Sequence, residues 1–313
     1  MNRYLPHFFS ILAIILVCAY ISYNESQRIA EKPKGFTSAT RQVSVEPMPY
    51  LNAVSLTLPK QLTFAGERVP LEIPDVRERL DRELHVNTYW HSSTIILLKK
   101  GNQWLPQISQ VLKEHGIPDD FKYLAAIEGG FINAVSPKNA VGFWQIRKDA
   151  GKENGLEINK IVDERYDPIK STEAACSYLL KAYEKFGNWT NVAASYNRGM
   201  AGFSRALNSQ KVNSYYDLLL NEETSRYVFR ILAIKEIFEH PEAYGFEIDQ
   251  EHLYEEENLK FVDVEKDIVD LVKFAKEQGI NYKLLKRHNP WLRDDYLKVR
   301  RNKVYKIAIP VNS

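Results

Sequence analysis

Residues 123–146 read YLAAIEGGFINAVSPKNAVGFWQI, and this stretch decides which fold and function we expect. Its first residues are apolar at helical spacing and stop at Gly129-Gly130, which predicts a helix that ends there. Glu128 therefore stands in the last turn of a helix, among apolar neighbours. Apolar surroundings and the negative end of the helix dipole both disfavour a carboxylate, so the pKa of Glu128 should be raised. General acid catalysis near neutral pH requires a carboxyl group of this kind.

Aromatic and amide side chains follow Glu128 in two short segments. Phe143, Trp144 and Gln145 come directly after a glycine, and Tyr196 and Asn197 lie shortly before another one. Rings stack on sugars and amides bind acetamido groups, so this combination suits a glycan with N-acetyl groups. Two other interpretations stay open here. Glu128 can be a solvated residue at a helix end, and the two rings of Trp144 and Tyr196 can belong to the core while Gln145 caps a helix.

The composition is that of a globular protein: 313 residues, 44% hydrophobic, 26% charged and 12% aromatic. It excludes wholesale disorder, and the length allows one large domain or two. The net charge of +2 argues against a nucleic-acid-binding protein that relies on a broad basic surface. Because Cys18 lies in an N-terminal apolar run, Cys176 has no disulfide partner in the rest of the chain. No Cys and His residues stand at ligand spacing, so we expect no metal site.

The N-terminal residues 1–24 have the form of a secretory signal or a short membrane anchor. Residues 8–23 are apolar and uncharged, and Arg3 precedes them. A run of this length is marginal for a membrane span, which usually needs about 20 residues. No small-x-small cleavage site is evident, so we expect an uncleaved anchor and an exported protein of the cell envelope or periplasm. A cleaved signal, a lipid-modified Cys18 and a buried helix are the alternatives.

The rest of the chain divides by pattern. Residues 25–74 contain six prolines and no sustained periodicity, which is typical of a linker and an irregular lead-in. Residues 75–245 show helical spacing of apolar residues and no convincing strand, with helix ends at Gly116, at Gly187 and near Pro241. We therefore expect a helical domain over 75–245.

Residues 259–313 differ from the helical part. Their pattern predicts a strand, two short helices and a closing strand, which together make a small α+β module. The second half of this module is basic, and it is either a solvated face or a patch that suits an anionic polymer. The basic residues are Lys286, Arg287, Arg293, Lys298, Arg300, Arg301, Lys303 and Lys306.

Four ordered blocks of the helical part together resemble a known family. They are Ile127-Glu128-Gly129-Gly130-Phe131, Gly142-Phe143-Trp144-Gln145-Ile146, Ala194-Ser195-Tyr196-Asn197-Arg198-Gly199 and Glu223-Thr224-Ser225-Arg226-Tyr227-Val228. Over roughly residues 65–245 the chain resembles the lysozyme-like lytic transglycosylases of bacterial cell-wall metabolism, specifically the membrane-bound lytic murein transglycosylase D family. The resemblance implies a mainly α protein in which a lysozyme-like helical catalytic domain precedes a small α+β module. That module, with its order β-α-α-β, resembles a degenerate LysM domain, a peptidoglycan-binding fold, without the usual glycine-bearing turn before the last strand.

The resemblance also implies roles for the residues singled out above. Glu128 becomes the catalytic acid and base, and Tyr227 reaches toward the scissile bond. Gln145, Tyr196 and Asn197 then line the glycan cleft. Phe143 and Trp144 are expected to bind the substrate as well, because of the aromatic faces noted above. Gly129 departs from the pattern, because the family usually has a serine directly after the catalytic glutamate. A slow or inactive variant is therefore an alternative, unless another hydroxyl or a water replaces the serine.

The expected reaction needs a single enzyme carboxyl group. Conventional glycoside hydrolysis uses two carboxylates, whereas the resemblance supplies only Glu128. It implies non-hydrolytic cleavage of the β-1,4 bond between N-acetylmuramic acid and N-acetylglucosamine, which leaves 1,6-anhydro-muramyl ends and needs no cofactor. A hydrolytic muramidase is the alternative enzyme, with Asp163, Glu164 or Asp167 as the nearest second acid. The alternative without catalysis is a scaffold that only binds peptidoglycan strands, which are the expected partner in every case.

Overall fold

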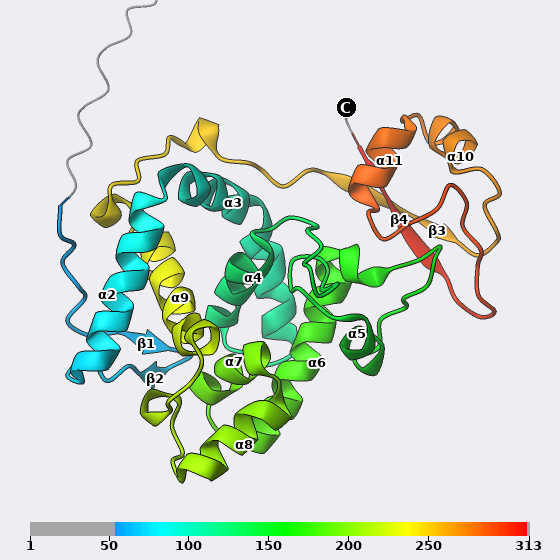
Figure 1. Cartoon of the computed structure of the whole chain (residues 1–313). Coiled ribbons are helices and arrows are strands. Elements are labelled where there is room, and N and C mark those ends of the chain that lie inside the picture. Colours follow the sequence, from blue (N-terminus) through cyan, green and yellow to red (C-terminus); the bar gives the residue numbers. More distant parts are fainter. Residues whose placement is uncertain (1–53, 312–313) are drawn as a thin grey trace, which may run out of the picture. The chain divides into compact units, whose positions relative to one another are not determined.

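The computed structural model describes residues 54–311, and most of them are helical (Figure 1). The expected mainly α class is confirmed. The helices are α2 (Pro74–Tyr89), α3 (His91–Glu114), α4 (Lys122–Gly129), α5 (Lys148–Glu153), α6 (Pro168–Phe186), α7 (Trp189–Arg198), α8 (Met200–Gln210), α9 (Glu222–Glu239), α10 (Leu271–Glu277) and α11 (Tyr282–His288). Single 3₁₀ turns are η1 (Asp119–Phe121), η2 (Glu164–Tyr166), η3 (Tyr215–Asp217), η4 (Pro241–Tyr244) and η5 (Gln250–His252). The strands are β1 (Thr63–Phe64), β2 (Glu67–Arg68), β3 (Leu259–Val264) and β4 (Tyr305–Pro310).

The expected N-terminal anchor, residues 8–23, lies outside the described residues, as do Cys18 and most of the expected linker. Within residues 54–311, no helix combines the length and the apolar character that a membrane span requires.

Helix α9 lies at the centre of the helical part. From Thr224 to Ile237 every residue except Arg226 and Arg230 is buried, including the polar ones. A helix buried to this extent is surrounded by other elements on nearly all sides. Helices α2, α4 and α7 all pack against α9, and one hydrophobic core extends through these elements. Any side chain that α9 directs toward α4 is therefore held from several sides.

A small hairpin precedes the helices, inside the segment expected to be irregular. Strand β1 pairs antiparallel with β2, with Thr63 opposite Arg68 and Phe64 opposite Glu67. The turn between them needs positive φ at both of its residues, and Gly66 supplies one of them. Phe64 is fully buried in the core of the helical part. This portion of the lead-in thus packs as part of the helical domain.

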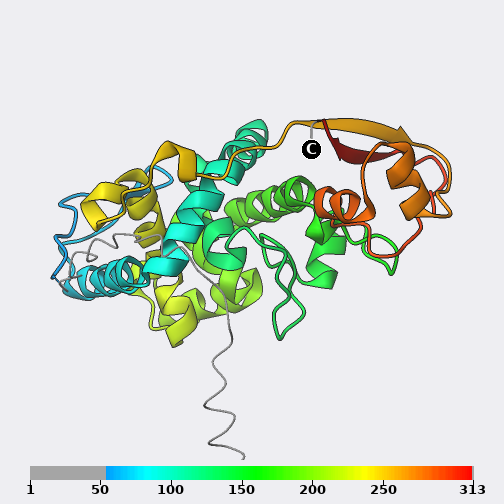
Figure 2. The ribbon, with the colours of Figure 1, turned by 90° about the horizontal axis from the view of Figure 1, so that it is seen from above.

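The C-terminal module has the expected order of strand, two helices and strand. Strands β3 and β4 pair antiparallel, from Leu259 opposite Pro310 to Val264 opposite Tyr305. In Figure 2 the two strands lie side by side, and α10 and α11 pack next to them. The module has a hydrophobic core of its own, which also takes in Val162 from the helical part. Val162 pairs with Leu292 in an isolated antiparallel bridge.

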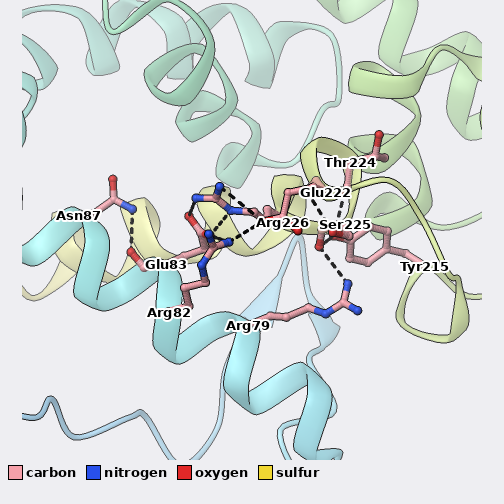
Figure 3. A network of polar contacts seen from close by, with 9 residues as sticks. All are labelled: Arg79, Arg82, Glu83, Asn87, Tyr215, Glu222, Thr224, Ser225 and Arg226. Carbon is pink, nitrogen blue, oxygen red and sulfur yellow. Dashed lines mark hydrogen bonds and ion pairs between the residues drawn. The ribbon is translucent and has the colours of Figure 1, made fainter.

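A polar network joins α2 to the first turns of α9 (Figure 3). Glu83 is 1% exposed, and its carboxylate accepts hydrogen bonds from Arg226 Nε at 2.6 Å and Arg226 Nη2 at 3.2 Å. Arg79 Nη1 donates to the Ser225 carbonyl at 3.3 Å, and the Tyr215 hydroxyl donates to the same oxygen at 2.5 Å. A forked arginine–carboxylate pair fixes orientation as well as distance. The network therefore sets the position of the start of α9 relative to α2.

Substitution of Glu83 with Gln should destabilise the fold, because it leaves the guanidinium of Arg226 without its buried counter-charge. We expect the free energy of unfolding to fall by about 2 kcal/mol, less than for a fully buried pair, since Arg226 is partly exposed. Glu222→Gln is the matched control, because the Glu222 side chain is 72% exposed and should cost less than about 0.5 kcal/mol. Urea unfolding followed by circular dichroism measures both values, and equal losses would contradict the structural role of the network.

Candidate active site

Four of the residues expected in the site line one cavity of about 540 Å³: Glu128, Gln145, Tyr196 and Asn197. They come from the end of α4, from the loop before α5 and from the end of α7. Other polar residues of the lining are Ser136, Lys138, Arg147, Asn154, Tyr178, Arg198 and Glu223. The structure thus brings together residues as distant in the sequence as Glu128 and Glu223.

Glu128 occupies the position predicted for it, in the last turn of α4. The helix ends because Gly130 adopts the left-handed conformation (φ 56°) and its N–H donates to the Ala126 carbonyl. Glu128 is half-buried at the cavity wall. Its Oε1 accepts a hydrogen bond of 2.5 Å from the hydroxyl of Tyr227, which is 1% exposed on α9. The carboxyl group is therefore oriented by a hydrogen bond from a buried side chain.

The surroundings of Glu128 raise its pKa, as the sequence predicted. Burial is the largest cause, because it penalises the charged form. The Tyr227 hydrogen bond and the positive charge of Arg230 act in the opposite direction, while the charge of Glu223 raises the pKa further. The net effect is a raised pKa.

Tyr227 and Tyr196 also have strongly raised pKa values, chiefly through burial. Each tyrosine therefore keeps its proton and acts as a neutral hydrogen-bond donor. The Tyr227 hydroxyl donates to Glu128, whereas the Tyr196 hydroxyl donates to the Trp144 carbonyl at 2.8 Å.

Trp144 and Phe143, which we expected to bind the substrate through their aromatic faces, are placed differently. Trp144 is fully buried, and its Nε1–H donates to Thr172 Oγ1 at 2.8 Å. Phe143 is 3% exposed and packs edge-on against Trp104 with ring centroids 5.0 Å apart. Neither ring lines the cavity with Glu128, so these side chains belong to the core and offer no stacking surface there. The sequence left a core position open for the rings of Trp144 and Tyr196; this interpretation holds for Trp144, whereas Tyr196 lines the cavity.

Gln145 and Asn197 are amides that line the cavity and also hold its walls. Gln145 has φ 46°, a left-handed conformation, and its Nε2 donates to the Gly142 carbonyl at 2.9 Å. Asn197 Nδ2 donates to Glu223 Oε1 at 3.1 Å, and its Oδ1 accepts from Thr224 Oγ1 at 2.8 Å. The first amide stabilises the loop before α5, and the second joins the end of α7 to the start of α9.

Glu223 is a carboxylate of the cavity that sequence reasoning did not single out. It is exposed, in the first turn of α9, where a negative charge suits the positive end of the helix dipole. The sequence did contain a signal. Glu223 stands four residues before Tyr227, and residues at this spacing lie on the same face of a helix.

The structure explains why glycine occupies position 129, where the family usually has serine. A Cβ atom at this position would lie 2.6 Å from Phe143 Cα and 2.7 Å from the Gly142 carbonyl oxygen. Both contacts are with backbone, which cannot turn away as a flexible side chain would. Glycine therefore allows the loop at Gly142-Phe143 to pack directly on the end of α4.

The three acids considered for a hydrolytic reaction have structural contacts instead. Asp163 forms a buried pair with Arg165, with 2.7 Å between Oδ2 and Nη2. Glu164 accepts from Lys303 Nζ at 3.0 Å. Asp167 caps α6 by accepting the N–H groups of its first turn, and burial raises its pKa. None of the three lines the cavity that contains Glu128.

One cluster in residues 54–311 has the composition of a metal site: Asp249, Glu251 and His252. All three are exposed, and none of them lines the cavity. Exposed acidic groups of this kind are common without a metal, so the cluster adds nothing to the site around Glu128.

Comparisons with known proteins agree with the geometry. Residues 108–218 match the family model described as the transglycosylase SLT domain, and residues 260–313 match the soluble lytic transglycosylase C-terminal LysM-like domain. The chain is 28% identical over 235 residues to the membrane-bound lytic murein transglycosylase D of Escherichia coli strain K12, and equally to that of E. coli O6:H1. This alignment covers 72% of the chain and 50% of each relative, so the chain spans about half the length of the curated relatives it matches.

Two further similarities are more limited. A putative tributyltin chloride resistance protein of Alteromonas sp. strain M-1 is 28% identical over 114 residues, which is 36% of this chain and 55% of that protein. A solved structure of an inactive mutant of the lytic transglycosylase Slt from Pseudomonas aeruginosa aligns with a TM-score of 0.38 at 16% identity, over 56% of this chain and 33% of that one. The chain therefore contains a transglycosylase SLT domain followed by a LysM-like domain, as its resemblance to the lytic murein transglycosylases predicted.

Proposed function

We propose that the chain is a peptidoglycan lytic transglycosylase that cleaves the β-1,4 bond between N-acetylmuramic acid and N-acetylglucosamine without water. The observation that carries this proposal is a half-buried Glu128 with a raised pKa, which faces a cavity and is held by Tyr227. The SLT domain and the names of the relatives support the class of reaction.

In the proposed reaction, Glu128 first acts as an acid. Its protonated carboxyl group gives its proton to the glycosidic oxygen, and the bond to the anomeric carbon of the muramyl residue breaks. The 2-acetamido group of that residue assists at the anomeric carbon. Glu128, now a carboxylate, takes the proton of the muramyl 6-hydroxyl, whose oxygen closes the 1,6-anhydro ring. Attack within one molecule has a high effective concentration, so no enzyme nucleophile is needed.

The neighbours of Glu128 fit both halves of this cycle. Burial favours the protonated carboxyl group that the first step requires. The Tyr227 hydroxyl donates to the carboxylate that forms next, so this intermediate is not left without a partner. Gln145, Tyr196 and Asn197 line the same cavity and are proposed to contact the glycan.

A hydrolytic muramidase is the second candidate, because one further carboxylate lines the cavity. Glu223 would have to act as the base that activates water, since the three acids Asp163, Glu164 and Asp167 lie outside the lining. Glu223 is instead joined to Asn197. The products separate the two reactions: anhydro-muramyl ends support the transglycosylase, and reducing ends support the hydrolase.

The remaining parts of the proposal concern organisation and location. We propose a catalytic domain over residues 75–245, to which the hairpin of residues 63–68 contributes its buried Phe64, and a LysM-like module over 259–313. The rest of residues 25–74 is the proposed linker and lead-in. The partner is the peptidoglycan glycan strand. The name of the E. coli relatives and the apolar residues 8–23 support a place in the cell envelope, with that segment as anchor.

Glu128→Gln should abolish turnover, because glutamine can neither give a proton to the glycosidic oxygen nor take one back. We expect release of anhydro-muropeptides from purified sacculi to fall by about a thousandfold, the scale of general acid–base catalysis. Mass spectrometry of the released products measures this loss and identifies the ends.

Glu239→Gln is the matched control for that experiment. Glu239 also ends a helix and accepts a tyrosine hydroxyl, that of Tyr123 at 3.4 Å, but it is exposed and lies outside the cavity. Its variant should keep full turnover. Unchanged release by Glu128→Gln would contradict the catalytic role, and reducing ends from the native chain would contradict the transglycosylase reaction.

The pH dependence should depend on Tyr227. The acid form of Glu128 is active in the first step, so the rate should fall as the pH rises through the raised pKa of this group. We call this fall the alkaline limb of the pH–rate profile. Tyr227→Phe removes a hydrogen bond that lowers the pKa of Glu128, so the alkaline limb should move to higher pH while the maximal rate falls.

Tyr196→Phe is the control for the position of the limb, because the Tyr196 hydroxyl donates to the Trp144 carbonyl and not to Glu128. Rates of cleavage of a soluble glycan across pH measure both variants. A limb that Tyr227→Phe leaves unmoved, or moves to lower pH, would contradict the assignment of the limb to Glu128.

A further inference from the structure

A second cleft, of about 990 Å³, lies between the segment that follows α5 and the C-terminal module. We call it the basic cleft. Lysines and arginines from both parts of the chain line it: Lys152, Lys160, Lys298, Arg300 and Arg301. The acidic residues of its lining are Glu157 and Asp294. Three of the eight basic residues that the sequence left without a function, Lys298, Arg300 and Arg301, therefore line a cavity.

The positive charge of the basic cleft is largely uncompensated. In the described part of the chain, no carboxylate lies within 4.0 Å of the side-chain nitrogens of Lys152, Lys160, Lys298 or Arg301. Glu157 is already occupied, because its Oε2 accepts from Lys303 Nζ at 2.6 Å and from the Tyr305 hydroxyl at 2.9 Å. A cleft with this charge attracts anions, and guanidinium and ammonium groups are suited to carboxylates.

The two walls of the basic cleft are fixed to each other. The Asp163 N–H donates to the Trp291 carbonyl at 2.9 Å, and the Arg293 N–H donates to the Ile161 carbonyl at 2.7 Å. Val162 is 1% exposed in the core of the module. The cleft is therefore preformed, and a ligand need not bring its walls together.

The basic cleft and the active-site cavity lie on two sides of α5. Ala150 lines the active-site cavity and Lys152, in the same short helix, lines the basic cleft. Figure 1 shows α5 and the loop after it next to the C-terminal module. A polymer bound beside Glu128 can therefore reach the basic cleft with groups that it carries along its length.

We propose that the basic cleft binds the carboxylates of the peptide stems carried by the glycan strand on which Glu128 acts. This inference rests on the proposed function, because only that function identifies the bound polymer as a peptidoglycan strand. Because stem and glycan belong to one molecule, binding of the first raises the effective concentration of the second at the cavity.

The test uses the full chain with Glu128→Gln, so that binding is measured without turnover. Lys160, Lys298 and Arg301 are replaced together by Gln, and Arg300 is kept because it approaches Glu157 at 3.8 Å. Pelleting with purified sacculi should show affinity about tenfold weaker and less dependent on salt, as expected for the loss of exposed charges. The control replaces Lys260, Lys266 and Lys276, which are exposed lysines of the same module outside the cleft, and should bind as the parent does.

Glycan strands stripped of their stems by an amidase, with the lactyl carboxyl groups that this hydrolysis exposes then converted to methylamides, identify the ligand. The parent chain should bind them more weakly than intact sacculi, and the cleft variant should bind them as the parent does. The proposal would be overturned if the cleft variant bound sacculi as tightly as the parent does, or if the control variant lost as much affinity as the cleft variant. It would also be overturned if the cleft variant lost as much affinity for stem-free strands as for sacculi. Binding is read without cleavage, so a failure of the proposed reaction shows separately, in the products of the native chain.

Discussion

The hydrogen bond between the Tyr227 hydroxyl and Glu128 joins the helix that supplies the carboxyl group to the most buried helix of the domain. Helix α4 is only two turns long and could not by itself hold a carboxyl group against a cavity. Helix α9 is surrounded by α2, α4 and α7, and the Glu83–Arg226 pair fixes its first turns. The position of one oxygen atom thus depends on packing that extends across the helical part of the chain.

The opposite wall of the cavity depends on a buried arginine. Arg165 Nη1 donates to the Asn139 carbonyl at 3.1 Å and to the Ile146 carbonyl at 3.2 Å, and Asp163 holds the guanidinium with two hydrogen bonds. The loop packs so closely that a Cβ atom on Gly142 would lie 2.1 Å from the Arg165 carbonyl oxygen. Since the Asp163 N–H in turn donates to the Trp291 carbonyl, the C-terminal module supports the loop that carries Gln145. The module is therefore part of the architecture of the cavity, in addition to any binding of its own.

The sequence predicted what depends on local pattern. The ends of α4 and α6 follow from Gly130 and Gly187, which both adopt the left-handed conformation, and the raised pKa of Glu128 follows from its apolar neighbours. The β1–β2 hairpin was missed because strands of two residues carry no periodicity.

The wrong expectations for the aromatic residues have a different cause. Phe143 and Trp144 follow a turn, and the direction of a side chain after a turn depends on packing. The motif alone therefore could not show whether their rings face the core or the cavity. For Glu223, the four-residue spacing to Tyr227 indicated a shared helix face, but the packing of α9 against α4 that brings this face to the cavity appears in no local pattern.

A titration of the Glu128 carboxyl group, by infrared difference spectroscopy against Glu128→Gln, tests the central claim most directly. The account predicts a midpoint above that of an ordinary glutamate, and a midpoint at or below the ordinary value would contradict it.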